Sequence, residues 1–225
     1  MKRSAGILLP VFSLPSPYGI GTMGKAAYQF VDFLLKANQS WWQILPLGPT
    51  NYGDSPYQSY SSFAGNPYFI DLERLQEEGL LDAEDLGVDW GEDPKKVDYK
   101  QLYAYRLDVL RRSMKRGWER EAAEIERFLS ENSGWLREYT LFMALKRHYG
   151  MRPWTEWDED IRMRRPEAVE RYRQMLWEDI RFFGYIQYLF FKQWNALRKY
   201  ANDRGIGIIG DIPIYTAMDS ADVWA

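Results

Sequence analysis

The apolar run WWQILPL, residues 41–47, is the stretch that decides the fold. It is too short for a typical helix and is followed by Gly-Pro, as is typical of a buried strand. A comparable run, AGILLPVF at residues 5–12, precedes it, and apolar residues between positions 26 and 35 recur at helical spacing. A strand, a helix and a second strand in this order predict a β-α-β unit over residues 5–47, with parallel strands joined by a crossover helix.

The helical signals in the rest of the chain are long and interrupted. Thr22 is a plausible N-cap of the first helix, and Asn38 is a plausible end. Residues 102–149 and 167–200 carry helical periodicity, whereas residues 151–166 hold tryptophans and prolines without a sustained period. We therefore expect a mainly helical insertion after the second strand.

A third strand candidate follows this insertion. Gly205 breaks the helical pattern, and residues 206–209 form a short buried-strand candidate that ends before Gly-Asp. The simplest topology is α/β, the N-terminal portion of a (β/α)8 TIM barrel with strands 1 to 3 and a helical insertion between strands 2 and 3. We expect residues 1–70 to hold strands 1 and 2 with a substrate loop, 71–180 the insertion subdomain, and 181–225 the return helix and strand 3. The remaining strands of the barrel are expected outside this chain.

Composition excludes several classes of function. The 225 residues carry a net charge of −3 with both signs interspersed, so no basic stripe is present for a nucleic-acid partner. Cysteine is absent and His148 is the single histidine, which argues against cysteine chemistry, clustered zinc ligands and a Ser-His-Asp triad. No run approaches the roughly 20 apolar residues of a membrane span, and prolines interrupt the N-terminal apolar run. We therefore expect a cytoplasmic protein with no metal site and no membrane partner.

Aromatic residues are abundant, with ten Trp, sixteen Tyr and eleven Phe. Aromatic faces pack well against the apolar faces of sugars, but they also fill protein cores. Composition alone therefore favours a carbohydrate ligand only weakly.

Three segments follow the predicted strands, at the edge where an α/β barrel carries its ligand site. They are residues 13–21, 48–68 and 211–224. Asp211 stands where a carboxylate can face the barrel mouth, although an Asp in Asp-Ile-Pro is equally typical of a turn that bonds its own backbone. In the stretch GPTNYGDSPYQSY, Tyr52 and Tyr57 lie among turn residues and have no periodic reason to be core residues.

Glycoside chemistry normally needs two carboxyl groups, about 5 to 5.5 Å apart in retaining enzymes. Asp211 is one good candidate position. Asp54 is the closest alternative for a partner, but it lies in a turn-rich loop that is a poor place to fix such a separation. The residues thus indicate a sugar-holding surface without a convincing catalytic pair.

Four stretches carry a resemblance that extends from about Gly6 to Ala225. They are SLPSPYGIGTMG, WWQILPLGPTNYGDSPYQSYSSFAGNPYFIDL, LFMALK and GIIGDIPIYTAMDSADVWA. These stretches resemble the start of the amylomaltases, the 4-α-glucanotransferases also called disproportionating enzymes, in the α-amylase clan. The long second stretch is far more specific than a short motif.

The resemblance implies a (β/α)8 barrel enzyme that cuts an α-1,4-glucan through a covalent glucosyl-enzyme intermediate and transfers it to another sugar. It implies no metal and no organic cofactor, and its partners are α-1,4-glucans and maltooligosaccharides, including chains derived from starch and glycogen. The nucleophile Asp and the acid/base Glu of such enzymes come from the fourth and fifth strands, which are expected beyond Ala225. The resemblance therefore implies no catalytic residue within this chain.

Carried over by position, Asp211 matches the acid that contacts the sugar at the cleavage point. Tyr57 matches the tyrosine that lines the same subsite, with Ser55 beside it. Tyr52 and Tyr103 match aromatics associated with a second glucan-holding groove. The segment DIPIYT lacks the histidine found there in the wider clan, as in amylomaltases.

Two alternatives stay open at this point. The chain fits a non-catalytic glucan-binding module that uses Tyr52, Tyr57 and Tyr103 as platforms, and it also fits a hydrolase of the same clan. We expect the isolated chain to leave maltotriose unchanged, and the sequence leaves the oligomeric state open.

Overall fold

The computed structural model describes residues 3–91, 93 and 96–225, which group into two compact units interleaved along the sequence. The first unit comprises Met1–Leu47, Asn66–Arg120 and Leu189–Ile212. The second unit comprises Gly48–Gly65, Glu121–Tyr188 and Pro213–Ala225.

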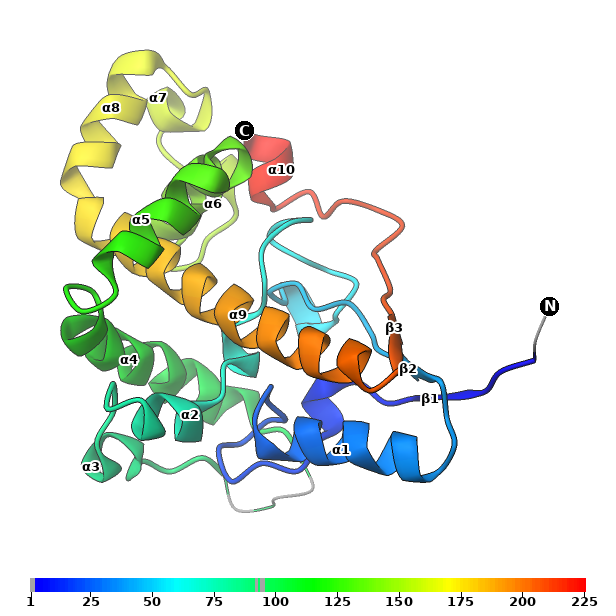
Figure 1. Cartoon of the computed structure of the whole chain (residues 1–225). Helices are drawn as coiled ribbons and strands as arrows, with labels where there is room; N and C mark the ends of the chain where they lie inside the picture. The colour runs from blue at the N-terminus through cyan, green and yellow to red at the C-terminus, as the bar shows by residue number, and fades with distance from the viewer. Residues whose placement is uncertain (1–2, 92, 94–95) are drawn as a thin grey trace. The chain divides into compact units, whose positions relative to one another are not determined.

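A parallel sheet of three strands lies in the first unit, in the order β1-β2-β3 (Figure 1). The strands are Gly6–Leu8 (β1), Trp41–Gln43 (β2) and Gly207–Ile209 (β3). The central strand pairs Trp42 with Ile7 on one side and with Ile208 on the other. The three predicted strands and the parallel β-α-β unit are therefore confirmed.

Helices make up most of the rest of the described chain. Those of the first unit are η1 (Val11–Ser13), α1 (Lys25–Lys36), η3 (Pro67–Phe69), α2 (Leu72–Glu77), α3 (Ala83–Leu86) and α4 (Tyr99–Gly117). Those of the second unit are η2 (Tyr52–Asp54), α5 (Ala122–Glu131), α6 (Ser133–His148), η4 (Trp154–Glu156), α7 (Glu159–Arg162), α8 (Pro166–Met175) and α10 (Ala221–Trp224). The long helix α9 (Trp177–Asp203) contributes its first part to the second unit and its last part to the first. The expected mainly helical insertion between the second and third strands is present.

Each of the first two strands is shorter than the apolar run that predicted it. Pro10 and Pro46 have no N–H group to donate to a neighbouring strand, so the regular ladder cannot extend through them. The N–H of Leu9 still donates to the carbonyl of Gln43 at 3.0 Å, just before Pro10. The prolines explain why the strands end early.

The two faces of the sheet differ in burial. Trp42 is fully buried, and its ring meets Phe30 of α1 edge-on at 5.1 Å. On the opposite face Leu8, Trp41 and Ile209 are 52%, 39% and 42% exposed. The prediction of buried strands therefore holds for one face only, because the other face, which lines the interior of a closed barrel, is uncovered in three strands.

Glycine is required on both sides of Trp41 in the sheet. A Cβ atom on Gly6 would lie 2.5 Å from the Cβ and the carbonyl oxygen of Trp41. A Cβ atom on Gly207 would lie 2.3 Å from the indole ring. The two glycines therefore make room for the tryptophan at the centre of the ladder.

The first helix ends as predicted but begins differently. Asn38 has a φ of 52°, and the N–H of Gln39 donates to the carbonyl of Leu34 at 2.9 Å, which is a Schellman-type C-terminus. The N-cap predicted at Thr22 is wrong, because the helix starts at Lys25 and Thr22 serves another purpose. Its hydroxyl donates to the Asp71 carboxylate at 2.6 Å, and Asp71 caps α2.

The stretch 167–200, which carries helical periodicity, forms two helices. The structure divides it into α8 and α9 at Leu176, whose φ and ψ of −106° and 19° leave the helical region. The sequence contains no Gly or Pro at this point, so no local signal marks the break.

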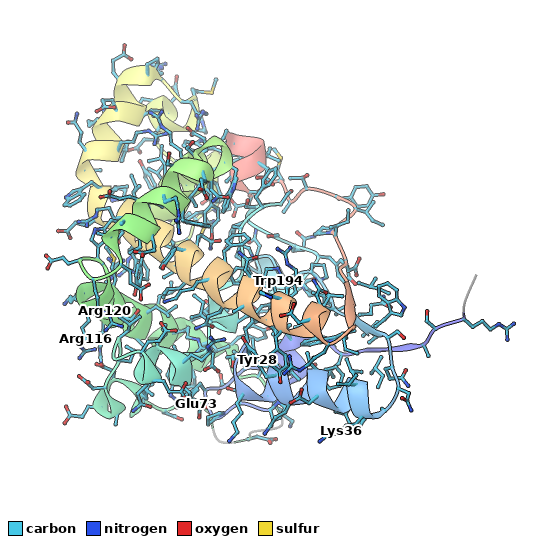
Figure 2. The ribbon with its side chains drawn as sticks, viewed as in Figure 1. Tyr28, Lys36, Glu73, Arg116, Arg120 and Trp194 are labelled. Atoms are coloured by element: carbon cyan, nitrogen blue, oxygen red, sulfur yellow. The ribbon has the colours of Figure 1, made fainter. Side chains whose placement is uncertain are left out.

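Helix α1 packs against its neighbours in the first unit through Tyr28 (Figure 2). The Tyr28 ring meets Tyr200 of α9 at 4.7 Å, and the Arg74 guanidinium of α2 donates to the Tyr28 hydroxyl at 2.7 Å. One tyrosine thus joins α1 to both α2 and α9.

A buried glutamine fixes the chain where it enters α2. The N–H of Asp71 donates to Gln193 Oε1 at 2.7 Å, and Gln193 Nε2 donates back to the Asp71 carbonyl at 3.1 Å. Gln193 is 2% exposed, so these two bonds satisfy backbone groups that water does not reach. We call this arrangement a glutamine clamp.

Replacing Gln193 by Leu should lower the free energy of unfolding by about 2–6 kcal/mol. The change leaves the N–H and the carbonyl of Asp71 without partners, and each unsatisfied buried group costs about 1–3 kcal/mol. Urea unfolding checks the value. Gln174→Leu, on the exposed surface of α8, is the control and should change it by less than about 0.5 kcal/mol. Equal effects of the two substitutions would contradict the clamp.

Candidate functional site

The candidate site segment after β2 is an ordered loop in the second unit. Thr50 and Ser59 form an antiparallel bridge, and the N–H of Asn51 donates to the carbonyl of Gln58 at 2.8 Å. At the loop's far end the N–H of Gly65 donates to Gln187 Oε1, and Gln187 Nε2 donates to the Gly65 carbonyl, both at 2.8 Å. This second glutamine clamp and the bridge hold the loop at both ends.

The tip of this loop presents Ser55 and Tyr57. The carbonyl of Ser55 accepts from the N–H of Gln58 at 3.1 Å, and the Ser55 hydroxyl accepts from the N–H of Tyr57 at 3.3 Å. The Tyr57 side chain is 45% exposed. The turn therefore offers one tyrosine face toward solvent beside a serine hydroxyl. The side chain of Tyr52 lies outside the described part of the structure.

The structure ties the loop to the segment that follows β3. Asn51 Nδ2 donates to the carbonyl of Asp219 at 2.8 Å, and the N–H of Ala221 donates to the carbonyl of Tyr60 at 2.8 Å. The N–H of Ser62 donates to the Asp222 carboxylate at 2.6 Å. Parts of two segments that the barrel topology predicts to lie together thus share hydrogen bonds.

A buried ion pair lies beneath these contacts. Lys146 of α6 is 1% exposed, and its Nζ donates to Asp219 Oδ2 at 2.6 Å. The other carboxylate oxygen of Asp219 accepts from the N–H of Trp154 at 3.2 Å. Nζ of Lys146 also lies 5.3 Å from the centre of the Tyr60 ring. One cation therefore contacts helix, loop and the segment after β3.

Two groups of the loop titrate away from their ordinary values. Burial raises the pKa of Tyr60 to about 12, with smaller contributions from the negative charges of Asp219 and Asp54. Burial also raises the pKa of the Asp54 carboxyl. Asp54 has a φ of 56°, so its backbone adopts a left-handed conformation at the turn.

Asp211 lies two residues after β3, in the first unit. Its Oδ1 accepts from the N–H of Ile212 at 2.9 Å, which is the backbone bond expected of the turn interpretation. The following Ile212 is 80% exposed. The structure therefore places the carboxylate on an open strand end, and its contact with a sugar stays a prediction.

Tyr103 lies on α4 in the first unit and is 53% exposed. Its ring is 6.0 Å from Tyr68 and 6.1 Å from Tyr99, so three tyrosines form a row. Beneath the row the buried Arg106 donates to the carbonyl of Tyr68 at 2.6 Å, and burial lowers its pKa to about 10. Arg106 thus fixes the backbone at Tyr68, one of the three tyrosines.

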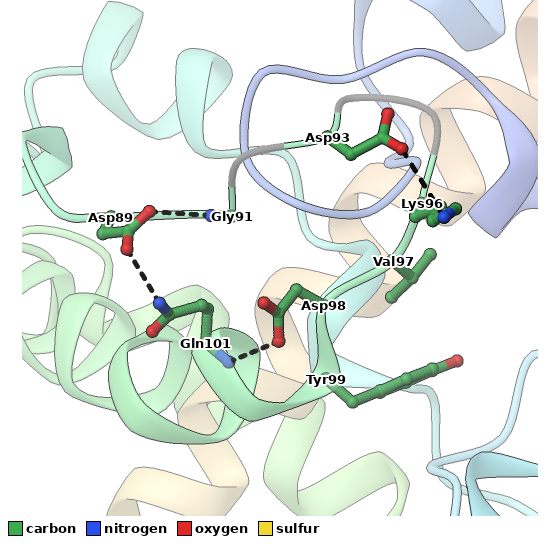
Figure 3. Close-up of a pocket in the computed structure, with 8 residues that line it drawn as sticks. All are labelled: Asp89, Gly91, Asp93, Lys96, Val97, Asp98, Tyr99 and Gln101. Atoms are coloured by element: carbon green, nitrogen blue, oxygen red, sulfur yellow. Dashed lines mark hydrogen bonds and ion pairs between the residues drawn. The ribbon is translucent and has the colours of Figure 1, made fainter.

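A cavity of about 420 Å³ is lined in part by Tyr99. Figure 3 shows the residues around it. Its polar groups bond one another: Asp89 accepts from the N–H of Gly91 at 2.9 Å and from Gln101 Nε2 at 2.8 Å. The N–H of Gln101 donates to Asp98 at 3.2 Å. Tyr103 does not line the cavity, although Tyr99 does.

A second cavity, of about 560 Å³, belongs to the segment after β1. It is lined by residues 12–17 and 19–21 and by Trp90, Gly91, Asp93, Lys96 and Val97. The predicted segment 13–21 therefore forms most of a hollow in the first unit.

The described residues offer no group of three or more His, Asp and Glu side chains that would hold a metal ion. His148 ends α6 and packs edge-on against Tyr149 at 4.9 Å and Tyr172 at 5.7 Å. No helix in the described part of the chain is both long enough and apolar enough to cross a bilayer.

Sequence reasoning missed the residues that support the loop. Lys146 and Gln187 are polar residues within strongly apolar helical stretches, which was a visible signal. Asp219 carried no comparable signal, because Asp-Ser in a loop is ordinary turn composition.

Comparison with known proteins gives consistent matches. The family described as 4-alpha-glucanotransferase matches residues 9–225. The 4-alpha-glucanotransferase of Streptococcus pneumoniae serotype 4 is 49% identical over 227 residues, which cover 100% of this chain and 45% of that protein. The Thermus thermophilus 4-alpha-glucanotransferase is 46% identical over 230 residues, with the same coverage of 100% and 45%.

Among solved structures, the amylomaltase from Streptococcus agalactiae in complex with acarbose matches with a TM-score of 0.96 at 45% identity. The match covers 100% of this chain and 46% of that chain. The likeness confirms the predicted α/β barrel fold class. The chain spans about half the length of the curated relatives that it matches.

The free energy of unfolding should fall less steeply between pH 10 and 12 in Tyr60→Phe than in the wild-type chain. Unfolded tyrosine ionises near its ordinary pKa of about 10, whereas folded Tyr60 stays protonated to about 12. The contribution of Tyr60 to the free energy of unfolding is therefore fully present below pH 10 and is lost as the pH rises to 12. Two pKa units correspond to about 2.7 kcal/mol, and we expect about 1–2 because Tyr60 keeps some contact with solvent.

Urea unfolding of both proteins between pH 9 and 12 measures this difference. Comparing the two curves cancels the opposing contribution of Arg106, whose lowered pKa raises the free energy of unfolding above pH 10, because the folded protein then binds fewer protons than the unfolded chain. Identical pH dependence in the two proteins would contradict the burial of the Tyr60 phenol.

Proposed function

The chain belongs to the 4-alpha-glucanotransferase family, and we propose a role for it on that basis. It supplies the glucan-holding part of an enzyme that transfers α-1,4-glucan segments. The donors and acceptors are maltooligosaccharides and chains derived from starch or glycogen. The observation that carries the proposal is the match over nearly the whole chain, together with a TM-score of 0.96 to an amylomaltase that binds acarbose. We place the protein in the cytoplasm, in keeping with its lack of cysteine.

In this proposal Asp211 hydrogen-bonds the sugar at the cleavage point, and Tyr57 and Ser55 line the same subsite. The exposed strand end that carries Asp211 and the ordered turn that carries Tyr57 support these roles. Tyr103 and Tyr52 hold a glucan in a second groove. The exposed ring of Tyr103 on α4, which lies 6.1 Å from that of Tyr99, supports this role.

The chemistry itself needs a nucleophile and an acid/base close together. We propose that neither is among these 225 residues and that both come from the fourth and fifth strands of the barrel. No metal or organic cofactor takes part. The role of this chain is then to bind and orient the glucan, which makes the two reacting groups effectively intramolecular.

Transfer, rather than hydrolysis, requires that a sugar acceptor outcompete water at the covalent intermediate. An aromatic wall that excludes water from the site favours this outcome. Tyr57, presented on a turn whose backbone is fixed by Ser55 and Gln58, is well suited to such a wall.

The full-length gene product incubated with maltotriose should form a ladder of longer maltooligosaccharides together with glucose. Chromatography of the products checks this result. Glucose and maltose without longer sugars would indicate a hydrolase, and unchanged maltotriose would indicate a non-catalytic binding module. The isolated 225-residue chain should leave maltotriose unchanged, and disproportionation by it would overturn the assignment of the catalytic groups to other strands.

In the same full-length protein, Tyr57→Ala should lower the transfer rate at least tenfold and raise the share of hydrolysis. The reason is that water gains access to the intermediate when the ring is removed. Tyr105→Ala, at a partly exposed position on α4 with no proposed role, is the matched control and should leave both rates near wild type. If transfer and hydrolysis fall in equal proportion, the ring contributes to binding only and the shielding idea is wrong.

A further inference from the structure

Lys146 is buried, charged and unused by the proposed glucan contacts. At 1% exposure its side chain is out of reach of a sugar. Its ammonium group donates to Asp219 Oδ2, to the carbonyl of Met151 at 2.8 Å and to the carbonyl of Arg152 at 2.9 Å. An ammonium group has three N–H donors, so each has a partner.

These three acceptors come from different parts of the second unit. Met151 and Arg152 follow α6, whereas Asp219 is separated from Lys146 by 73 positions in the sequence. An apolar side chain at position 146 would leave all three acceptors without the cation that gathers them. Removing one partner of a buried ion pair is strongly destabilising, although such pairs are not a sign of high stability in themselves. The pair therefore fixes the position of Asp219 relative to α6 and to the segment that follows it.

Two contacts join the ion pair to the loop of residues 51–60. The carbonyl of Asp219 accepts from Asn51 Nδ2 at 2.8 Å, and Asn51 opens the turn that carries Ser55 and Tyr57. The second contact is the Tyr60 ring, which lies over the Lys146 ammonium at the other end of the same turn. The ion pair thus contacts both ends of the turn.

We propose that Lys146 and Asp219 are positioning residues of the glucan site. They hold residues 51–60 in the conformation that presents Ser55 and Tyr57, and they do so without touching the sugar. This inference rests on the proposed function, because it assigns the ion pair a role in glucan affinity. Asn51 transmits the position of Asp219 to the loop.

Asn51→Ala is the gentlest test, because it removes one hydrogen bond between the ion pair and the loop and leaves the pair itself intact. Asn195→Ala, at an exposed position of α9, is its matched control. Lys146→Met is the stronger variant, and Lys199→Met, which breaks the exposed pair with Asp203, is the control for it. All four are compared with the wild-type chain.

Three quantities are measured on each protein. Amide hydrogen exchange reports the order of residues 51–60, an NMR titration gives the affinity for maltoheptaose, and urea unfolding gives the midpoint. We expect Asn51→Ala to exchange about tenfold faster in residues 51–60 and to bind maltoheptaose at least tenfold more weakly, with its midpoint nearly unchanged. Lys146→Met should show larger effects in the same residues, and both controls should behave as wild type.

Affinity equal to wild type in folded Asn51→Ala and Lys146→Met would overturn the inference, because the pair would then be structural only. Unchanged exchange in residues 51–60 would overturn it as well. If Lys146→Met does not fold, Asn51→Ala decides between these outcomes. A wild-type chain that does not bind maltoheptaose would contradict the proposed function instead, and the exchange rates of Asn51→Ala would still decide whether the loop depends on this contact.

Discussion

Two buried glutamines on α9 satisfy backbone groups at Gly65 and Asp71, in the chain between β2 and α2. Between β2 and α2 the chain forms only one isolated bridge, between Thr50 and Ser59, so many of its N–H and carbonyl groups need other partners in the interior. Gln187 supplies both bonds to Gly65 in the second unit, and Gln193 supplies both bonds to Asp71 in the first. The loop that carries the candidate residues Ser55 and Tyr57 can therefore be buried at its base and still be ordered.

On this base the second unit adds a charged contact at the middle of the loop. Lys146 donates to three acceptors, one of which is the carboxylate of Asp219. The carbonyl of Asp219 in turn accepts from Asn51 of the loop. Order in the loop thus comes largely from buried groups, and the Tyr57 side chain is 45% exposed. This division is what a site for a neutral, hydroxyl-rich ligand needs, since preorganised contacts cost less entropy on binding.

Much of this could be predicted from sequence, because the signals were local. Apolar runs and a helical repeat between them gave the parallel β-α-β unit, and Asn38 closed its helix as expected. Thr22 failed as an N-cap because a tertiary partner, Asp71, took its hydroxyl. The break at Leu176 has no Gly or Pro to mark it, and the exposed sheet face follows from the number of strands. The candidate site residues came from resemblance, whereas the Lys146 and Asp219 pair joins positions that no local pattern relates.

The central claim is that this chain holds the glucan and does not cut it. A titration of the isotope-labelled chain with maltoheptaose, followed by backbone amide NMR, tests it most directly, since the same sample shows the anomeric protons of the sugar. We expect chemical-shift changes concentrated at residues 51–60 and around Asp211, with the sugar unchanged over the experiment. Shifts confined to other residues, or conversion of maltoheptaose to other oligosaccharides, would contradict it.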